Sequence, residues 1–134
     1  MNKDKIEASL RNLAERKTYL NRIDYHLPEY DALEEELHVL EDSFQEEFGE
    51  YFEVVLSTIH DNVCPDSEML IPLAYMAATY NISENKIDVD SDHGVPVDAV
   101  AHPDKKSNLV LVPGPTRYLL MVDGVKEEVW VMEN

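Results

Sequence analysis

Residues 28–63 constrain the fold of this chain more than any other stretch, because they combine strong acidity with a regular apolar spacing. No lysine or arginine occurs between Arg22 and Lys86. The apolar residues recur every three or four positions: Tyr30, Leu33, Leu37, Leu40, Phe44, Phe48, Tyr51, Val55 and Ile59. This spacing aligns them on one face of a helix and leaves the acids on the others. The sequence therefore predicts a long acidic helix over residues 28–62. Its apolar face widens beyond Gly49, which predicts that this end is buried.

A second amphipathic helix is predicted over residues 3–26, directly before the acidic one. Its seam positions keep the same spacing, with one charged residue, Lys17, among them: Ile6, Leu10, Leu13, Lys17, Leu20 and Leu27, with Ala14 and Ile23 beside the seam. Pro28 disfavours helical geometry at the residue before it and suits the first turn of a new helix. A short connection between two long helices predicts an antiparallel helical hairpin, packed as a short coiled coil.

The residues after the hairpin give a weaker signal, which we interpret as a short third helix over residues 67–80. Its apolar residues keep helical spacing: Met69, Leu73, Met76 and Tyr80. Pro72 falls awkwardly near the end of the first turn of such a helix. A helix that begins at Ile71 or Pro72 is the alternative.

From residue 85 onward the apolar period changes to two, which is typical of strands. Five strands are predicted, over residues 86–90, 95–101, 108–112, 117–122 and 125–132. Asp123-Gly124 is a strong hairpin signal, and Pro113-Gly114-Pro115 forces a tight corner. Short connections favour an antiparallel meander. Helices first and strands after predict a single α+β domain.

The net charge of −17 is distributed unevenly along the 134 residues. Residues 1–22 carry an excess of basic side chains, whereas residues 23–85 carry sixteen acidic side chains and no lysine or arginine. A surface this acidic repels nucleic-acid phosphates and anionic lipids, so direct binding to DNA, RNA or membranes is not expected. The single cysteine and the lack of a long apolar segment predict a cytoplasmic protein.

A run of alternating carboxylates, Asp88, Asp90 and Asp92, is the best candidate metal site in the sequence. Several oxygen ligands near a turn suit Ca²⁺ or Mg²⁺. The run departs from the EF-hand pattern, because His93 separates the third acid from Gly94. The plainer interpretation is a strand with its acids in solvent. The metal hypothesis predicts that Ca²⁺ or Mg²⁺ raises the melting temperature and that Asp90→Ala removes the gain.

Two groups in the helical half also contain residue types that bind metals. Glu35 and His38 have the spacing used in di-iron helical bundles, but such a site needs two of these pairs and two more glutamates. The predicted hairpin tip gathers four more candidates: Asp24, His26, Glu29 and Asp31. Exposed carboxylates there could hold Mg²⁺. A solvated helix face and a capped turn are the plainer interpretations.

Nothing in the sequence points to a catalytic set or to an organic cofactor. Cys64 ends the acidic helix, and a helix C-terminus disfavours the thiolate that nucleophilic catalysis needs. His60 lies four positions before it, which is a weak signal by itself. With four glycines in the whole chain, no glycine-rich phosphate loop can be built. We therefore expect a protein without catalytic activity.

The acids that the basic first helix does not neutralise form the predicted binding surface. They are Glu34, Glu35, Glu41, Asp42 and Glu46. We expect a small interaction module that binds a basic protein through the hairpin or through a free face of the sheet. Trp130 is expected at an interface, together with self-association into a homo-oligomer, because large exposed aromatic residues often mark one. The alternative is a metal-dependent or ligand-binding domain that uses Asp88, Asp90 and Asp92 or the tip acids.

Overall fold

Helices occupy the first half of the chain and strands the second. The computed structural model describes residues 2–90 and 92–133. In chain order the elements are α1 (Lys3–Arg22), α2 (Tyr30–Val63), the 3-10 turn η1 (Pro72–Tyr75), β1 (Asn81–Ile82), β2 (Ile87–Asp88), β3 (Val95–Val97), β4 (Ser107–Val112), β5 (Arg117–Val122) and β6 (Val125–Val131). The α+β class, the N-terminal helical hairpin and the antiparallel pairing of the strands are confirmed, whereas the third helix and the number of strands in one sheet are wrong.

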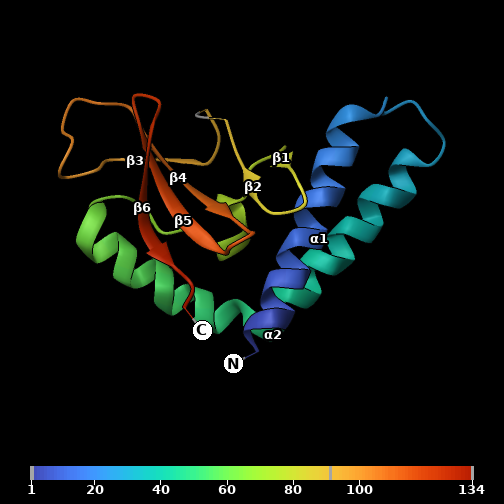
Figure 1. The fold of residues 1–134 in the computed structure, drawn as a ribbon, viewed down its shortest axis with the longest axis horizontal. Coiled ribbons are helices and arrows are strands. Elements are labelled where there is room, and N and C mark those ends of the chain that lie inside the picture. The colour runs from blue at the N-terminus through green and yellow to red at the C-terminus, as the bar shows by residue number, and fades with distance from the viewer. Residues whose placement is uncertain (1, 91, 134) are drawn as a thin grey trace.

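The hairpin has a longer connection than predicted, because α1 ends at Arg22 and α2 begins only at Tyr30. Asn2 caps α1, since its side-chain oxygen accepts a hydrogen bond from the Lys5 N–H at 3.0 Å. In the connection, Asp24 accepts a hydrogen bond from the His26 N–H at 2.8 Å and so forms an Asx turn. Figure 1 shows the two helices side by side, projecting away from the sheet as an arm.

The second helix, α2, is continuous but not straight. Its first half runs beside α1, and its second half turns to run along the sheet (Figure 1). The second half reaches the sheet where the rings of Phe52 and Trp130 lie 6.1 Å apart. Gly49, near the middle of the helix by number, is buried, and a Cβ atom there would collide with the side chain of Gln45. A glycine inside a helix weakens it locally and is a common place for a bend.

The strands form two separate sheets rather than one meander. Four strands pair in the order β3-β4-β5-β6, and β1 pairs only with β2. The predicted strand over residues 86–90 is therefore shorter and belongs to the small ribbon. Every residue of β4 and β5 is buried, so the centre of the larger sheet has no free face, contrary to the prediction. The edge strand β6 exposes its first four residues.

The predicted third helix is replaced by the short turn η1 within an extended segment. Two buried tyrosine hydroxyls hold this segment, because Tyr75 accepts a hydrogen bond from the Leu70 N–H at 3.0 Å and Tyr80 accepts one from the Ala77 N–H at 2.9 Å. The Tyr80 N–H in turn donates to the Thr18 hydroxyl at 3.0 Å. These contacts satisfy N–H groups that a helix would have bonded to its own carbonyls.

The corner between β4 and β5 connects the four-stranded sheet to the small ribbon and to α1. The Arg117 guanidinium is buried and donates to the carbonyls of Pro115 at 2.7 Å and of Ile87 in β2 at 2.8 Å. From α1, the Glu7 carboxylate accepts a hydrogen bond from the Thr116 N–H at 2.7 Å. One corner therefore holds the larger sheet, the small ribbon and the first helix together.

Two buried tyrosines provide a test of how polar groups are satisfied in this core. The Tyr80 hydroxyl donates to the Leu111 carbonyl at 2.8 Å, whereas the Tyr118 hydroxyl has no hydrogen-bond partner within the described residues. We expect Tyr80→Phe to lower the free energy of unfolding by about 1–3 kcal/mol, because it leaves buried backbone groups unpaired. Tyr118→Phe removes a hydroxyl that is buried without a partner, so it is expected to be neutral or stabilising.

Urea unfolding of both variants measures this difference. The two proteins differ from the parent by the same atom, and each original side chain is almost fully buried. If Tyr80→Phe and Tyr118→Phe lost equal amounts of unfolding free energy, the hydrogen bonds of the Tyr80 hydroxyl would not be stabilising the fold as proposed.

Candidate partner-binding surface

The first half of α2 arranges its residues in rows along the helix, as about 3.6 residues per turn require. The outer row points away from α1 and comprises Glu35, Val39, Asp42 and Glu46, all of them exposed. On one side of it lies the groove row: Glu36, Leu40, Ser43 and Glu47. On the other side lies the cleft row: Glu34, His38, Glu41 and Gln45. The five acids predicted to bind a partner thus fall into the outer row and the cleft row.

Ion pairs between the two helices use only acids of the groove row and the cleft row. Those found in the described residues are Lys5–Glu47 at 2.6 Å, Arg16–Glu36 at 2.8 Å and Lys17–Glu41 at 4.0 Å. Within residues 2–90 and 92–133, no lysine, arginine or histidine lies within 4.0 Å of an acid of the outer row. The outer row therefore keeps its negative charge in solvent, although α1 beside it is basic.

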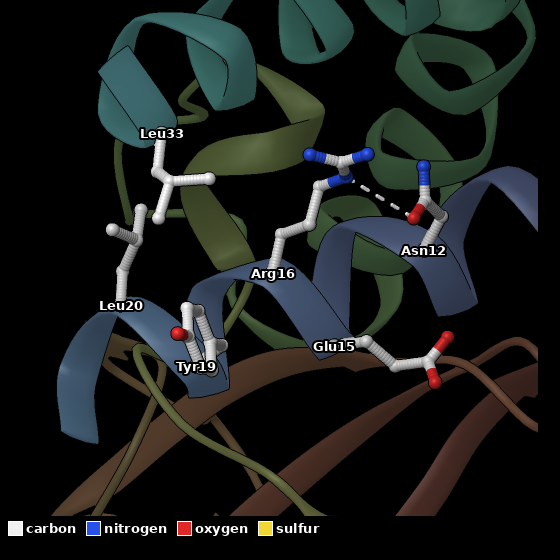
Figure 2. A pocket seen from close by; sticks show the side chains of 6 residues that line it. All are labelled: Asn12, Glu15, Arg16, Tyr19, Leu20 and Leu33. Carbon is white, nitrogen blue, oxygen red and sulfur yellow. Dashed lines mark hydrogen bonds between the residues drawn. The ribbon is translucent and has the colours of Figure 1, made fainter. Parts of the chain in front are cut away.

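An apolar groove runs between the groove row and α1. The hollow nearer the hairpin tip, here called the upper hollow, has a volume of about 310 Å³. It is lined by Leu20 and Leu33 and rimmed by polar residues of α1 (Figure 2). A second hollow of about 100 Å³ lies farther along, lined by Leu40, Phe44 and Phe48 among others. Asn12 lines both hollows, so they are neighbours on the same side of the hairpin.

The apolar spacing predicted that the α2 residues of this groove lie in the seam between the two helices. It did not predict that part of this seam is open to solvent. Leu33 and Leu40 are only partly buried, and Val39 in the neighbouring outer row is 59% exposed. The length of the apolar series could have indicated this opening. Two helices packed only against each other leave part of a long apolar face exposed.

A cleft on the opposite side of α2 contains two of the predicted acids, Glu41 and Asp42. Gln45 and residues of the η1 segment line it as well, among them Ile71, which is 62% exposed. The Lys17 ammonium lies in the same cleft, 4.0 Å from the Glu41 carboxylate. The charge of Glu41 is thus partly balanced by the chain itself, whereas Glu34 on the same row is exposed and has no ion pair among the described residues.

Trp130, the other residue predicted at an interface, packs within the chain. Its ring lies 5.9 Å from that of Tyr118, 6.1 Å from that of Phe52 and 6.4 Å from that of Tyr51, measured between ring centres. The residue is partly buried against the core. A partner reaching Trp130 would therefore contact the rim of an aromatic cluster that α2 and the sheet already form.

The three carboxylates of the predicted metal site have different surroundings. Asp88 accepts a hydrogen bond from the Lys126 ammonium at 2.9 Å, and Asp90 accepts one from the Asn81 side chain at 3.1 Å. Asp92 is exposed in the turn that follows. Burial raises the pKa of Asp88, but the bonds from Lys126 and from the Val89 N–H and the charge of Arg117 outweigh it, so the net pKa lies below its ordinary value. No cluster of three or more metal-ligating side chains occurs in the parts of the chain that the structure describes. The metal site remains a prediction.

The remaining candidates are also placed by the structure. His38 lies 3.2 Å from the Glu41 carboxylate on the exposed side of α2, and at the hairpin tip His26 lies 3.0 Å from Asp24. The tip acids Glu29 and Asp31 are exposed. His60 is buried and lies 3.0 Å from the Tyr75 hydroxyl. Burial also raises the pKa of the Cys64 thiol, which opposes thiolate formation.

Comparison with known proteins adds no relative from which a function can be transferred. The chain matches no protein family, no curated protein and no solved structure at a significant level. Among the described residues, no helix combines the length and the apolar character that crossing a bilayer requires. The geometry and the charge of α1 and α2 are therefore the basis for inferring a function.

Proposed function

We propose that this chain is a protein-interaction module that binds a basic protein segment along the outer row of α2. The observation that carries the proposal is the row itself: three exposed carboxylates at helical spacing that no cation of the described chain neutralises. Because charged surface patches steer oppositely charged partners and suppress wrong ones, such a row favours basic ligands.

The projecting arm supports the same proposal. Figure 1 shows α1 between the strands and the first half of α2, so a partner can approach the outer row of α2 from the side away from the strands. Every residue of β4 and β5 is buried, so the centre of the larger sheet offers no free face for this role. A role as an adaptor, as an inhibitor of a basic enzyme or as a mimic of nucleic-acid charge would use this surface in the same way. Self-association remains a prediction, which sedimentation velocity tests directly.

Charge reversal on the outer row tests the proposal. The triple variant Glu35→Lys, Asp42→Lys, Glu46→Lys is compared with a control triple at exposed acids elsewhere, Glu53→Lys, Asp61→Lys, Asp66→Lys. Both change the net charge equally. Each surface ion pair contributes about 0.2–1 kcal/mol, so we expect the outer-row variant to bind a basic partner about tenfold more weakly and the control variant to bind it nearly as well as the parent.

The measurement is affinity capture from the native host at low salt, followed by titration of the captured protein. A supporting result is a basic protein that the outer-row variant loses, that the control variant keeps and that high salt releases. Capture that is insensitive to salt, or equal loss in both variants, would show that the outer row is not the binding surface.

A further inference from the structure

We infer that the groove beside the outer row is the docking site for a basic amphipathic helix of the partner. The inference rests on the proposed function and adds the form of the ligand. Two observations meet at this groove: apolar hollows that the chain leaves open, and acids that flank them on the solvent side. An apolar floor beside a negative rim is complementary to a helix with one apolar face and basic flanks.

The spacing of the hollows matches the repeat of a helix. Leu33 lines the upper hollow and Leu40 the lower one, and they lie seven positions apart on α2. Seven helical residues span about 10 Å. A helix lying along the groove would therefore place apolar side chains seven positions apart, on its own apolar face, into the two hollows.

The chain's own charges fit this arrangement. Arg16 lines the upper hollow, donates to the Asn12 side chain at 3.2 Å and pairs with Glu36 at 2.8 Å (Figure 2). Lys5 pairs with Glu47 near the lower hollow. Arg16 and Lys5 of α1 are thus paired with two acids of the groove row, whereas Asp42 and Glu46 in the outer row remain open to cations of the ligand.

A second copy of this chain is a poorer occupant of the groove. Each copy carries a net charge of −17, so two acidic arms repel each other at close approach. A basic partner gains from the same charges. The occupant is therefore a helix with excess lysine or arginine, and self-association at the groove is one outcome that the test below separates.

A designed peptide tests the inference on the full chain. The probe is a fluorescently labelled 15-residue peptide of leucine and lysine, with its leucines at positions that form one helical face. The control probe has the same composition in a permuted order without an apolar face. Titration at low salt by fluorescence anisotropy is expected to give at least tenfold tighter binding for the amphipathic probe.

Two protein variants locate the bound peptide. Ser43→Trp places a bulky side chain at the lower hollow, and Ser57→Trp places the same side chain at an exposed position on the other half of α2. We expect Ser43→Trp to weaken binding of the amphipathic probe about tenfold and Ser57→Trp to leave it unchanged. Circular dichroism of both variants checks that the helices remain folded.

The outcomes separate the two proposals. If both probes bind equally and are released by salt, the groove inference is overturned while the acidic outer row is retained as a binding surface. If neither probe binds at low salt, the proposed function fails as well. If the parent chain self-associates, Ser43→Trp but not Ser57→Trp abolishes that association and the amphipathic probe does not bind, the groove is an interface between copies and the inference is overturned.

Discussion

Replacing Arg117 with alanine is expected to lower the free energy of unfolding by about 3–5 kcal/mol, because hydrogen bonds to a charged group contribute about 1.5–3 kcal/mol each and several would be lost. The Arg117 guanidinium donates to carbonyls of Pro113, Pro115 and Ile87, at 3.2, 2.7 and 2.8 Å. Hydrogen bonds to a charged group are stronger than neutral ones. Alanine would leave these acceptors without their donor and loosen the small ribbon from the larger sheet. Urea unfolding at neutral pH measures the loss.

A matched control separates burial from charge. Arg16 forms a more exposed ion pair with Glu36, at 2.8 Å, and Arg16→Ala is expected to cost no more than about 1 kcal/mol. If Arg117→Ala does not fold, Arg117→Lys keeps the charge but loses the fork of donors, and it should show an intermediate loss. A loss below about 1 kcal/mol for both Arg117 variants would mean that the corner is held by other contacts.

A methyl group at Gly94 is expected to cost about 2–5 kcal/mol, the sum of backbone strain and overpacking. Gly94 has φ +101°, a conformation that side chains disfavour. A Cβ atom there would lie 2.5 Å from the Leu109 carbonyl oxygen and 2.9 Å from the Val110 Cβ. Both neighbours belong to β4 in the sheet centre, so neither can move away easily. Thermal and urea unfolding of Gly94→Ala measure the effect.

Gly124 supplies the control, because it also has a positive φ, of +83°, but a Cβ atom there would meet nothing within 4 Å. Gly124→Ala therefore incurs the backbone strain alone, about 1–2 kcal/mol. The difference between the two variants isolates the packing against β4. Equal losses would show that the close approach of Gly94 to the strand relaxes without cost.

The sequence was most informative where local chemistry and tertiary structure agree. The apolar spacing of Leu37, Phe44 and Phe48 predicted a buried helix face, and all three are buried. The Asp123-Gly124 hairpin signal was also correct, since both residues have positive φ, 49° and 83°, as a two-residue turn requires. These features depend on neighbours within a few residues, which a sequence displays directly.

The sequence was misleading where a distant contact decides the local structure. Helical spacing in residues 67–80 is real, but Thr18, sixty-two positions away, accepts the hydrogen bond from the Tyr80 N–H. An irregularity between Tyr118 and Leu119 in the pairing with β6 changed the side on which Trp130 lies. Trp130 pairs with Tyr118 and Glu128 with Leu119, so the two β6 residues face opposite sides, although strict alternation places them together. A bulge of one residue thus turned a predicted interface residue toward the core.

Of the candidate surface, the sequence predicted the acids but not the groove, because the groove depends on contacts between distant residues. The unpaired acids follow from charge counting, and the structure separates them into an outer row without ion pairs and a cleft row that Lys17 partly balances. The groove beside them depends on how far α1 covers α2, which is a property of three-dimensional packing. Charge patterns along one helix do not contain this information.

The bond between Glu7 and Thr116 has a consequence for the order in which the protein is made. It joins residues 109 positions apart, so the first helix leaves the ribosome long before the Thr116 N–H that donates to it exists. During synthesis α1 can pair first with α2 and then with Tyr80 and Ser83, whereas its bond to the corner between β4 and β5 must wait until Thr116 has been made. The arm that we propose to bind a partner is therefore synthesised before the sheet that anchors it, and a partner can meet the arm at that stage.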